Sequence, residues 1–145
     1  MSIKGFLYSI RDETNEIKML QRQIEELEHT ASGIKAVTYD GVKVQTSRSS
    51  DPMADCLANL EECKVKLRDH TVKLYDRKQQ AIDLINALDD SRERQVLYLY
   101  FIGDNKMYMD DVADAIGYSR RETLYIYKRG LSNLSKVCTS LHLSL

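Results

Sequence analysis

The chain has 145 residues, of which 43% are hydrophobic and 30% are charged. That length suits one domain, or a small domain joined to an extended helical part. One proline and six glycines exclude collagen-like and Pro/Gly-rich disordered classes. No apolar run approaches the ~18 residues of a membrane span, so we expect no membrane contact. No apolar stretch follows the charged residues 1–5, so we expect no secretory signal. Three cysteines, an odd number, predict free thiols in a reducing, cytoplasmic compartment.

The charge is unevenly distributed. The net charge of the chain is −1, but residues 118–145 carry five Lys/Arg against one Asp/Glu. A basic end on an acidic body is the pattern expected of a nucleic-acid contact. A solvated basic helix is the alternative on charge alone.

Residues 3–28 predict a long helix. Isoleucine recurs every seven residues from Ile3 to Ile24, and Phe6, Leu20 and Leu27 lie three positions further on. This a/d pattern forms one apolar stripe that needs a partner helix.

A second long helix is predicted over residues 52–88. Asp51 is a good N-cap, Pro52 suits the first helical position, and leucine or alanine recurs every seven residues from Leu60 to Leu88. Two such helices most simply fold back as an antiparallel coiled-coil hairpin. A parallel homodimer, in which each stripe meets its copy, stays open.

The connector, residues 30–50, is rich in Ser, Thr and Gly. Within it, residues 34–39 and 42–46 flank Asp40-Gly41, a dipeptide that favours a type I′ turn. We therefore expect a short β-hairpin, with a mobile loop as the close alternative.

After residue 88 the pattern changes to short helices. Asp90 can cap a helix with Glu93 in a capping box, residues 96–102 are apolar on all sides, and residues 103–105 stop that helix. A short helix over 109–116, a turn at Gly117 and a helix over 119–135 capped by Ser119 follow. Six of the nine tyrosines lie between positions 98 and 127 and predict a small helical core.

This order is that of a helix-turn-helix. Ala113 is the small residue where the two helices cross, Gly117 supplies the turn, and Thr123 is a departure from the usual Val or Ile. The wider stretch resembles region 4 of bacterial sigma-70 factors. The matching segments are Leu88–Leu97 against "L-P-x-x-x-R-x-V-L", Tyr100–Gly103 against "R-Y-F-x-G", Asp111–Ser119 against "E-I-A-x-x-L-G-x-S" and Arg129–Leu134 against "R-A-L-x-x-L".

With its coiled hairpin, the whole chain is similar to small RinA- and ArpU-like transcriptional regulators of Gram-positive prophages. In the residues before this stretch we expect no sigma region of the kind that binds the −10 element. The resemblance implies an all-α protein of the bacterial cytoplasm: residues 1–88 a helical hairpin, 89–137 a helix-turn-helix domain and 138–145 a tail. It implies a sequence-specific regulator of phage type that binds double-stranded DNA.

The expected contacts lie on the helix over 119–135. The N-terminus of that helix, at Ser119, can hold a phosphate. Arg120 and Arg121 lie where base edges are usually read. Leu124, Tyr125 and Lys128 share their face, opposite an inward face of Thr123, Ile126 and Gly130. We assign Lys128, Arg129 and Lys136 to phosphates, which position a protein without specifying sequence.

Other chemistry is weakly indicated. Cys56, Cys63 and His70 are spaced by seven residues, about 10.5 Å per step along a helix, too far apart for one metal ion. We expect no enzyme, no metal and no cofactor. Two other functions stay open: a phage small terminase subunit for DNA packaging, and an adaptor that binds RNA polymerase or another protein.

Overall fold

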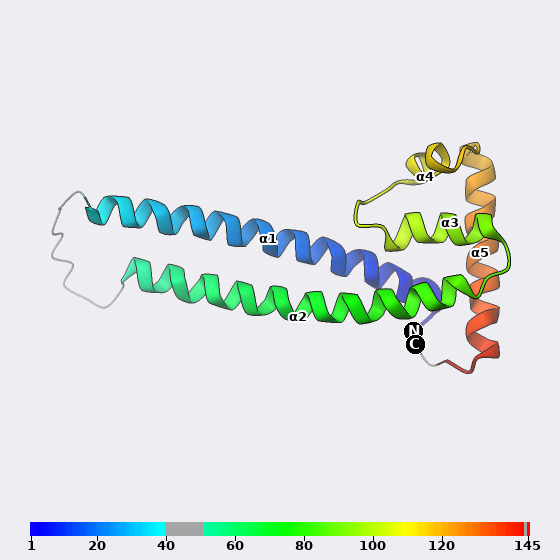
Figure 1. Cartoon of the computed structure of the whole chain (residues 1–145), viewed down its shortest axis with the longest axis horizontal. Coiled ribbons are helices and arrows are strands. Elements are labelled where there is room, and N and C mark those ends of the chain that lie inside the picture. Colours follow the sequence, from blue (N-terminus) through cyan, green and yellow to red (C-terminus); the bar gives the residue numbers. More distant parts are fainter. Residues whose placement is uncertain (40–50, 144) are drawn as a thin grey trace. The chain divides into compact units, whose positions relative to one another are not determined.

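The computed structural model of the protein describes residues 1–39, 51–143 and 145. The prediction of an all-α protein is confirmed, and the described residues contain no strand. The elements, in chain order, are α1 (Ile3–Tyr39), α2 (Pro52–Asn86), α3 (Ser91–Leu97), the π-helical turn η1 (Tyr98–Ile102), α4 (Met109–Ile116) and α5 (Arg120–Ser140) (Figure 1).

The chain forms two compact units, divided elsewhere than at the expected boundary between residues 88 and 89. One unit comprises Met1–Thr14 together with Lys73–Leu145, and the other comprises Asn15–Val72. The division falls within the long helices because their ends carry the apolar residues that pack with the short helices. Four residues of α1 belong to this shared core: Ile3, Phe6, Leu7 and Ile10.

In the unit Asn15–Val72, α1 and α2 meet within one chain. The Cys56 thiol donates to the backbone carbonyl of Leu27 (3.4 Å), and the Cys63 thiol lies 4.0 Å from the side-chain oxygen of Gln23. The contact further along α2 is made to a residue that lies earlier in α1, so the two helices run antiparallel. The predicted start of α2 is also confirmed, because the Asp51 carboxylate accepts from the backbone N–H of Met53 (3.1 Å).

The predicted end of the first helix at residue 28 is wrong, because α1 continues to Tyr39. The Thr30 hydroxyl donates to the carbonyl of Glu26, and the Ser32 hydroxyl to that of Glu28. These bonds satisfy the hydroxyls inside the helix, so the polar composition does not end it. The expected first strand, residues 34–39, is therefore helical, and the expected second strand, 42–46, lies outside the described residues.

The last helix is longer than expected. It ends at Ser140, and Cys138 is buried in the core, so the expected tail over 138–145 begins too early. Residues 96–102, which we expect to lie in one buried helix, also differ from the prediction. After Leu97 the chain forms the π-helical turn, and Tyr98 is 47% exposed.

Candidate nucleic-acid interface

The two helices and the turn expected over residues 109–135 are present as α4, Gly117–Ser119 and α5. The α4 helix spans the predicted residues and ends at Gly117, whose φ of 77° lies in the left-handed region that glycine tolerates. The backbone N–H groups of Gly117 and Tyr118 both donate to the carbonyl of Ala113. The Ser119 hydroxyl then accepts from the backbone N–H of Glu122 (3.1 Å), which caps α5 as predicted.

The two faces of α5 are sorted as the sequence predicts. Thr123 and Ile126 are fully buried, and Gly130 is buried against α3. The hydroxyl of Thr123 donates to the carbonyl of Ser119 (2.8 Å), which explains how a polar residue can occupy this apolar position. The opposite face is exposed and carries Arg120, Arg121, Leu124, Tyr125 and Lys128. We call these five residues the α5 outer face.

Gly130 allows α3 and α5 to approach closely. A Cβ atom at this position would lie 3.2 Å from Cδ1 of Leu97 and 3.4 Å from Cβ of Glu93. The absence of a side chain at Gly130 is therefore matched to this crossing.

Arg120 has a partner on the preceding helix. Its Nε lies 3.2 Å from Oδ1 of Asp110 in the first turn of α4, and both side chains are largely exposed. Arg121 and Lys128 are exposed as well, and no ion pair joins either to another described residue.

Arg129, which we expect to contact a phosphate, binds two acidic side chains. Its guanidinium forms ion pairs with Asp90 and Glu93, both near the start of α3. Two carboxylates therefore already share the charge of Arg129, and its assignment to DNA phosphates stays a prediction. The hydrogen bond that Arg129 donates to Glu93 is the main cause that raises the pKa of Arg129.

Glu93, which we expect in a capping box, is one of the two carboxylates that bind Arg129. We call Asp90, Glu93, Arg129 and Asn133 the network. The Glu93 side chain is only 2% exposed and accepts hydrogen bonds from Arg129 (2.6 Å) and from the Asn133 amide (3.0 and 3.1 Å). Asp90 caps α3 as predicted, by accepting from the N–H of Arg92 (2.8 Å). A signal was present in the sequence: Val96 and Leu97, three and four residues after Glu93, place it on the apolar face of a short helix.

Lys136 lies apart from the α5 outer face. It lines a depression of about 450 Å³ together with the network residues Asp90, Glu93, Arg129 and Asn133. The structure thus brings five of the predicted contacts together on one exposed face beside Ser119. The guanidinium of Arg129 lies 5.6 Å from the centre of the Tyr125 ring of that face, and Lys136 lies in the depression.

A tyrosine cluster, not predicted as such, joins the start of α1 to this unit. The hydroxyl of Tyr8 lies 3.3 Å from that of Tyr100 and 3.4 Å from that of Tyr127. Arg11 lies 4.1 Å above the Tyr100 ring and donates to the carbonyl of Met107 (3.0 Å). Burial, followed by the hydrogen bond with Tyr8, raises the pKa of Tyr127. Residues 1–14 are therefore part of the unit that presents α5.

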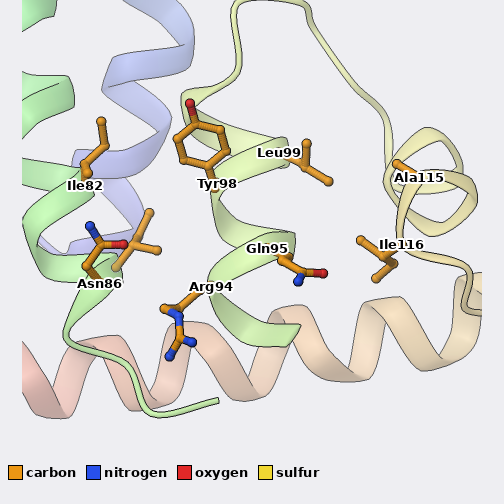
Figure 2. A pocket seen from close by; sticks show the side chains of 9 residues that line it. Ile82, Asn86, Arg94, Gln95, Tyr98, Leu99, Ala115 and Ile116 are labelled. Atoms are coloured by element: carbon orange, nitrogen blue, oxygen red, sulfur yellow. The ribbon is translucent and has the colours of Figure 1, made fainter. Parts of the chain in front are cut away.

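An apolar pocket of about 360 Å³ opens on the same unit (Figure 2). The side chains that line it come from α2, α3, η1 and α4: Ile82, Ile85, Asn86, Arg94, Gln95, Tyr98, Leu99, Ala115 and Ile116. None of them belongs to α5, so this pocket is a surface distinct from the α5 outer face.

Within residues 1–39, 51–143 and 145, no group of three or more His, Cys, Asp or Glu side chains is placed to hold a metal ion. No helix in the described part of the chain has the length and apolar character of a membrane span.

Comparison with known proteins gives one family. None of the curated proteins or solved structures compared with the chain matches it. A family model described as "Protein of unknown function (DUF1492)" matches residues 35–134. Because this match covers more than half of the 145 residues, the chain belongs to the DUF1492 family.

Proposed function

We propose that this protein is a sequence-specific regulator of transcription, of phage or prophage type, that binds double-stranded DNA. The predicted recognition helix, residues 119–135, forms the first part of α5 and enters the major groove. The proposal includes no cofactor. It includes RNA polymerase, or a second copy of the chain, as a further binding partner of the protein.

The α5 outer face is the observation that carries this proposal. A buried face of Thr123, Ile126 and Gly130 fixes α5 against the rest of the unit, so the outer face is held toward solvent. Three of its five residues are cationic, and the capped N-terminus adds backbone N–H groups that favour a phosphate. The α5 outer face thus combines groups that attract DNA of any sequence with side chains that can contact bases.

The outer face offers two kinds of base contact. The guanidinium groups of Arg120 and Arg121 can each donate two hydrogen bonds to O6 and N7 of guanine. Leu124 is 38% exposed and Tyr125 is 62% exposed, so both can contact a thymine methyl group. Lys128 is left to neutralise a phosphate.

Selection from a random duplex library at about 150 mM salt tests the proposal. We expect the wild type to enrich one motif, and the variant Arg120→Ala/Arg121→Ala to bind that motif at least about tenfold more weakly. Lys18→Ala/Arg22→Ala is the matched control, since it removes two positive charges from exposed positions of α1. It should keep the motif and its affinity. Salt-sensitive binding without any enriched motif, equal in all three proteins, would contradict sequence-specific regulation.

The pocket in Figure 2 favours a second candidate, an adaptor that binds RNA polymerase or another protein through an apolar surface. In that case Tyr98→Lys, which places a charge in the pocket, would abolish binding to purified RNA polymerase, and the arginine variant would not. Loss of polymerase binding in both variants, or in neither, would speak against the pocket as the contact.

A further inference from the structure

The ion pair between α4 and α5 has a geometry suited to base reading. Asp110 contacts Nε of Arg120, on the inner side of the guanidinium, at 3.2 Å. The two terminal nitrogens of that guanidinium are the atoms that donate to O6 and N7 of guanine in a two-bond contact. The pair therefore restrains the side chain and leaves its recognition edge available.

Asp110 differs from the two other acidic residues of α4. Asp111 accepts a hydrogen bond from the backbone N–H of Tyr108 (2.9 Å) and thereby caps the helix. Asp114 is exposed and forms no ion pair with another described residue. Of these three described acidic residues, Asp110 alone forms an ion pair with the α5 outer face, and the cap does not require it.

The Asp110 carboxylate also affects how the protein interacts with DNA phosphates. It offsets the positive charge of Arg120, and it repels the DNA backbone, so it weakens binding that is independent of sequence. A restrained guanidinium loses less side-chain freedom when it meets a guanine than a free one does. Both effects increase the difference between specific and non-specific affinity.

We infer that Asp110 is a positioning residue that holds Arg120 for guanine recognition and so sets the base specificity of the α5 outer face. This inference rests on the proposed function. It adds a residue outside the recognition helix to the determinants of specificity.

The test compares Asp110→Asn with Asp114→Asn, which removes the same charge from the same helix. The base position read by Arg120 is first located as the position at which Arg120→Ala loses its preference. At that position we expect Asp110→Asn to lower the preference for guanine about two- to fivefold, the range of an exposed ion pair. Asp114→Asn should leave the preference unchanged, although both variants bind non-specific DNA somewhat more tightly.

A double-variant cycle separates positioning from a structural effect. In the Arg120→Ala background, Asp110→Asn should no longer change the preference at this position, because the side chain that it restrains is gone. An unchanged preference in Asp110→Asn, or an equal loss in Asp114→Asn, would overturn the inference while leaving the proposed function intact. A wild type that enriches no motif would instead overturn the proposed function, and the inference with it.

Discussion

At the scale of the residue, Gly117 decides whether α4 and α5 can be joined at this angle. Its φ of 77° lies in the left-handed region, and a Cβ placed on it would meet no atom within 4 Å. Steric crowding is therefore absent, and the cost of a side chain here is that of the backbone conformation itself. A substitution at Gly117 therefore tests the backbone conformation alone.

Gly117→Ala should lower the free energy of unfolding by about 1–2 kcal/mol, since an L side chain rarely adopts this conformation. Gly117→Asn should cost less, because asparagine visits the left-handed region more readily. Urea denaturation followed by circular dichroism measures both. Equal losses for the two variants would show that packing, and not backbone conformation, sets the cost.

At the scale of the element, α3 and α5 are joined by a charged network and by a close approach. Asp90 and Glu93 of the α3 region hold Arg129 of α5, and Gly130 beside it lets the helices touch. Glu93 is buried, and breaking such a pair leaves an uncompensated charge. The network therefore fixes the position of α5 and, with it, that of the outer face.

The network predicts a pH dependence of stability. Hydrogen bonds from the backbone N–H and then the side chain of Arg92, with Arg129 nearby, lower the pKa of Asp90 in the folded state. A lowered folded pKa gives stability that is present above the unfolded value of ~4 and is lost as the pH falls through the folded value. Asp90→Asn should thus be less stable than the wild type at pH ~7, and the difference should shrink below pH ~4.

Urea denaturation at a series of pH values checks this prediction. Asp114→Asn is the control, and its small difference from the wild type should change little over the same range. A difference between Asp90→Asn and the wild type that persists unchanged at the lowest pH would mean that the charge of Asp90 is not what matters.

At the scale of the whole molecule, the unit that presents α5 is assembled from both ends of the chain. Leu7 and Ile10 are fully buried, and they pack in one core with residues such as Phe101 and Leu134. The start of α1 is thus a structural part of the unit that presents α5, although the 58 residues Asn15–Val72 separate the two parts of that unit in sequence.

Leu7→Ala should lower the free energy of unfolding by about 2–5 kcal/mol, because it leaves a cavity in this core. It should also weaken DNA binding, although Leu7 lies far from α5 in sequence. Met19→Ala, at an exposed position of the same helix, is the control and should change stability by less than about 0.5 kcal/mol. A stable Leu7→Ala variant would show that residues 1–14 do not belong to the core.

The range of each interaction decides how much of this could be predicted from sequence. The caps at Asp90 and Ser119, the turn at Gly117 and the bounds of α4 depend on residues within a few positions, and all were predicted. The Glu93–Arg129 pair spans 36 residues, and the Tyr8–Tyr127 contact spans 119. Such pairs follow from the packing of helices, which periodicity along one helix does not specify.

The tyrosine cluster gives the protein an intrinsic optical probe. The chain contains no tryptophan, so its absorption near 280 nm comes chiefly from nine tyrosines. Three of these phenols meet at the edge of the core, and burial raises the pKa of Tyr127 above its ordinary value of ~10. Burial acts in the same direction on Tyr8, but hydrogen bonds with Tyr100 and Tyr127 outweigh it and lower the pKa of Tyr8. In an alkaline spectrophotometric titration we therefore expect the phenolate signal of the cluster to spread over a wider pH range while residues 1–14 stay docked. That signal can follow the association of the two chain ends without any label.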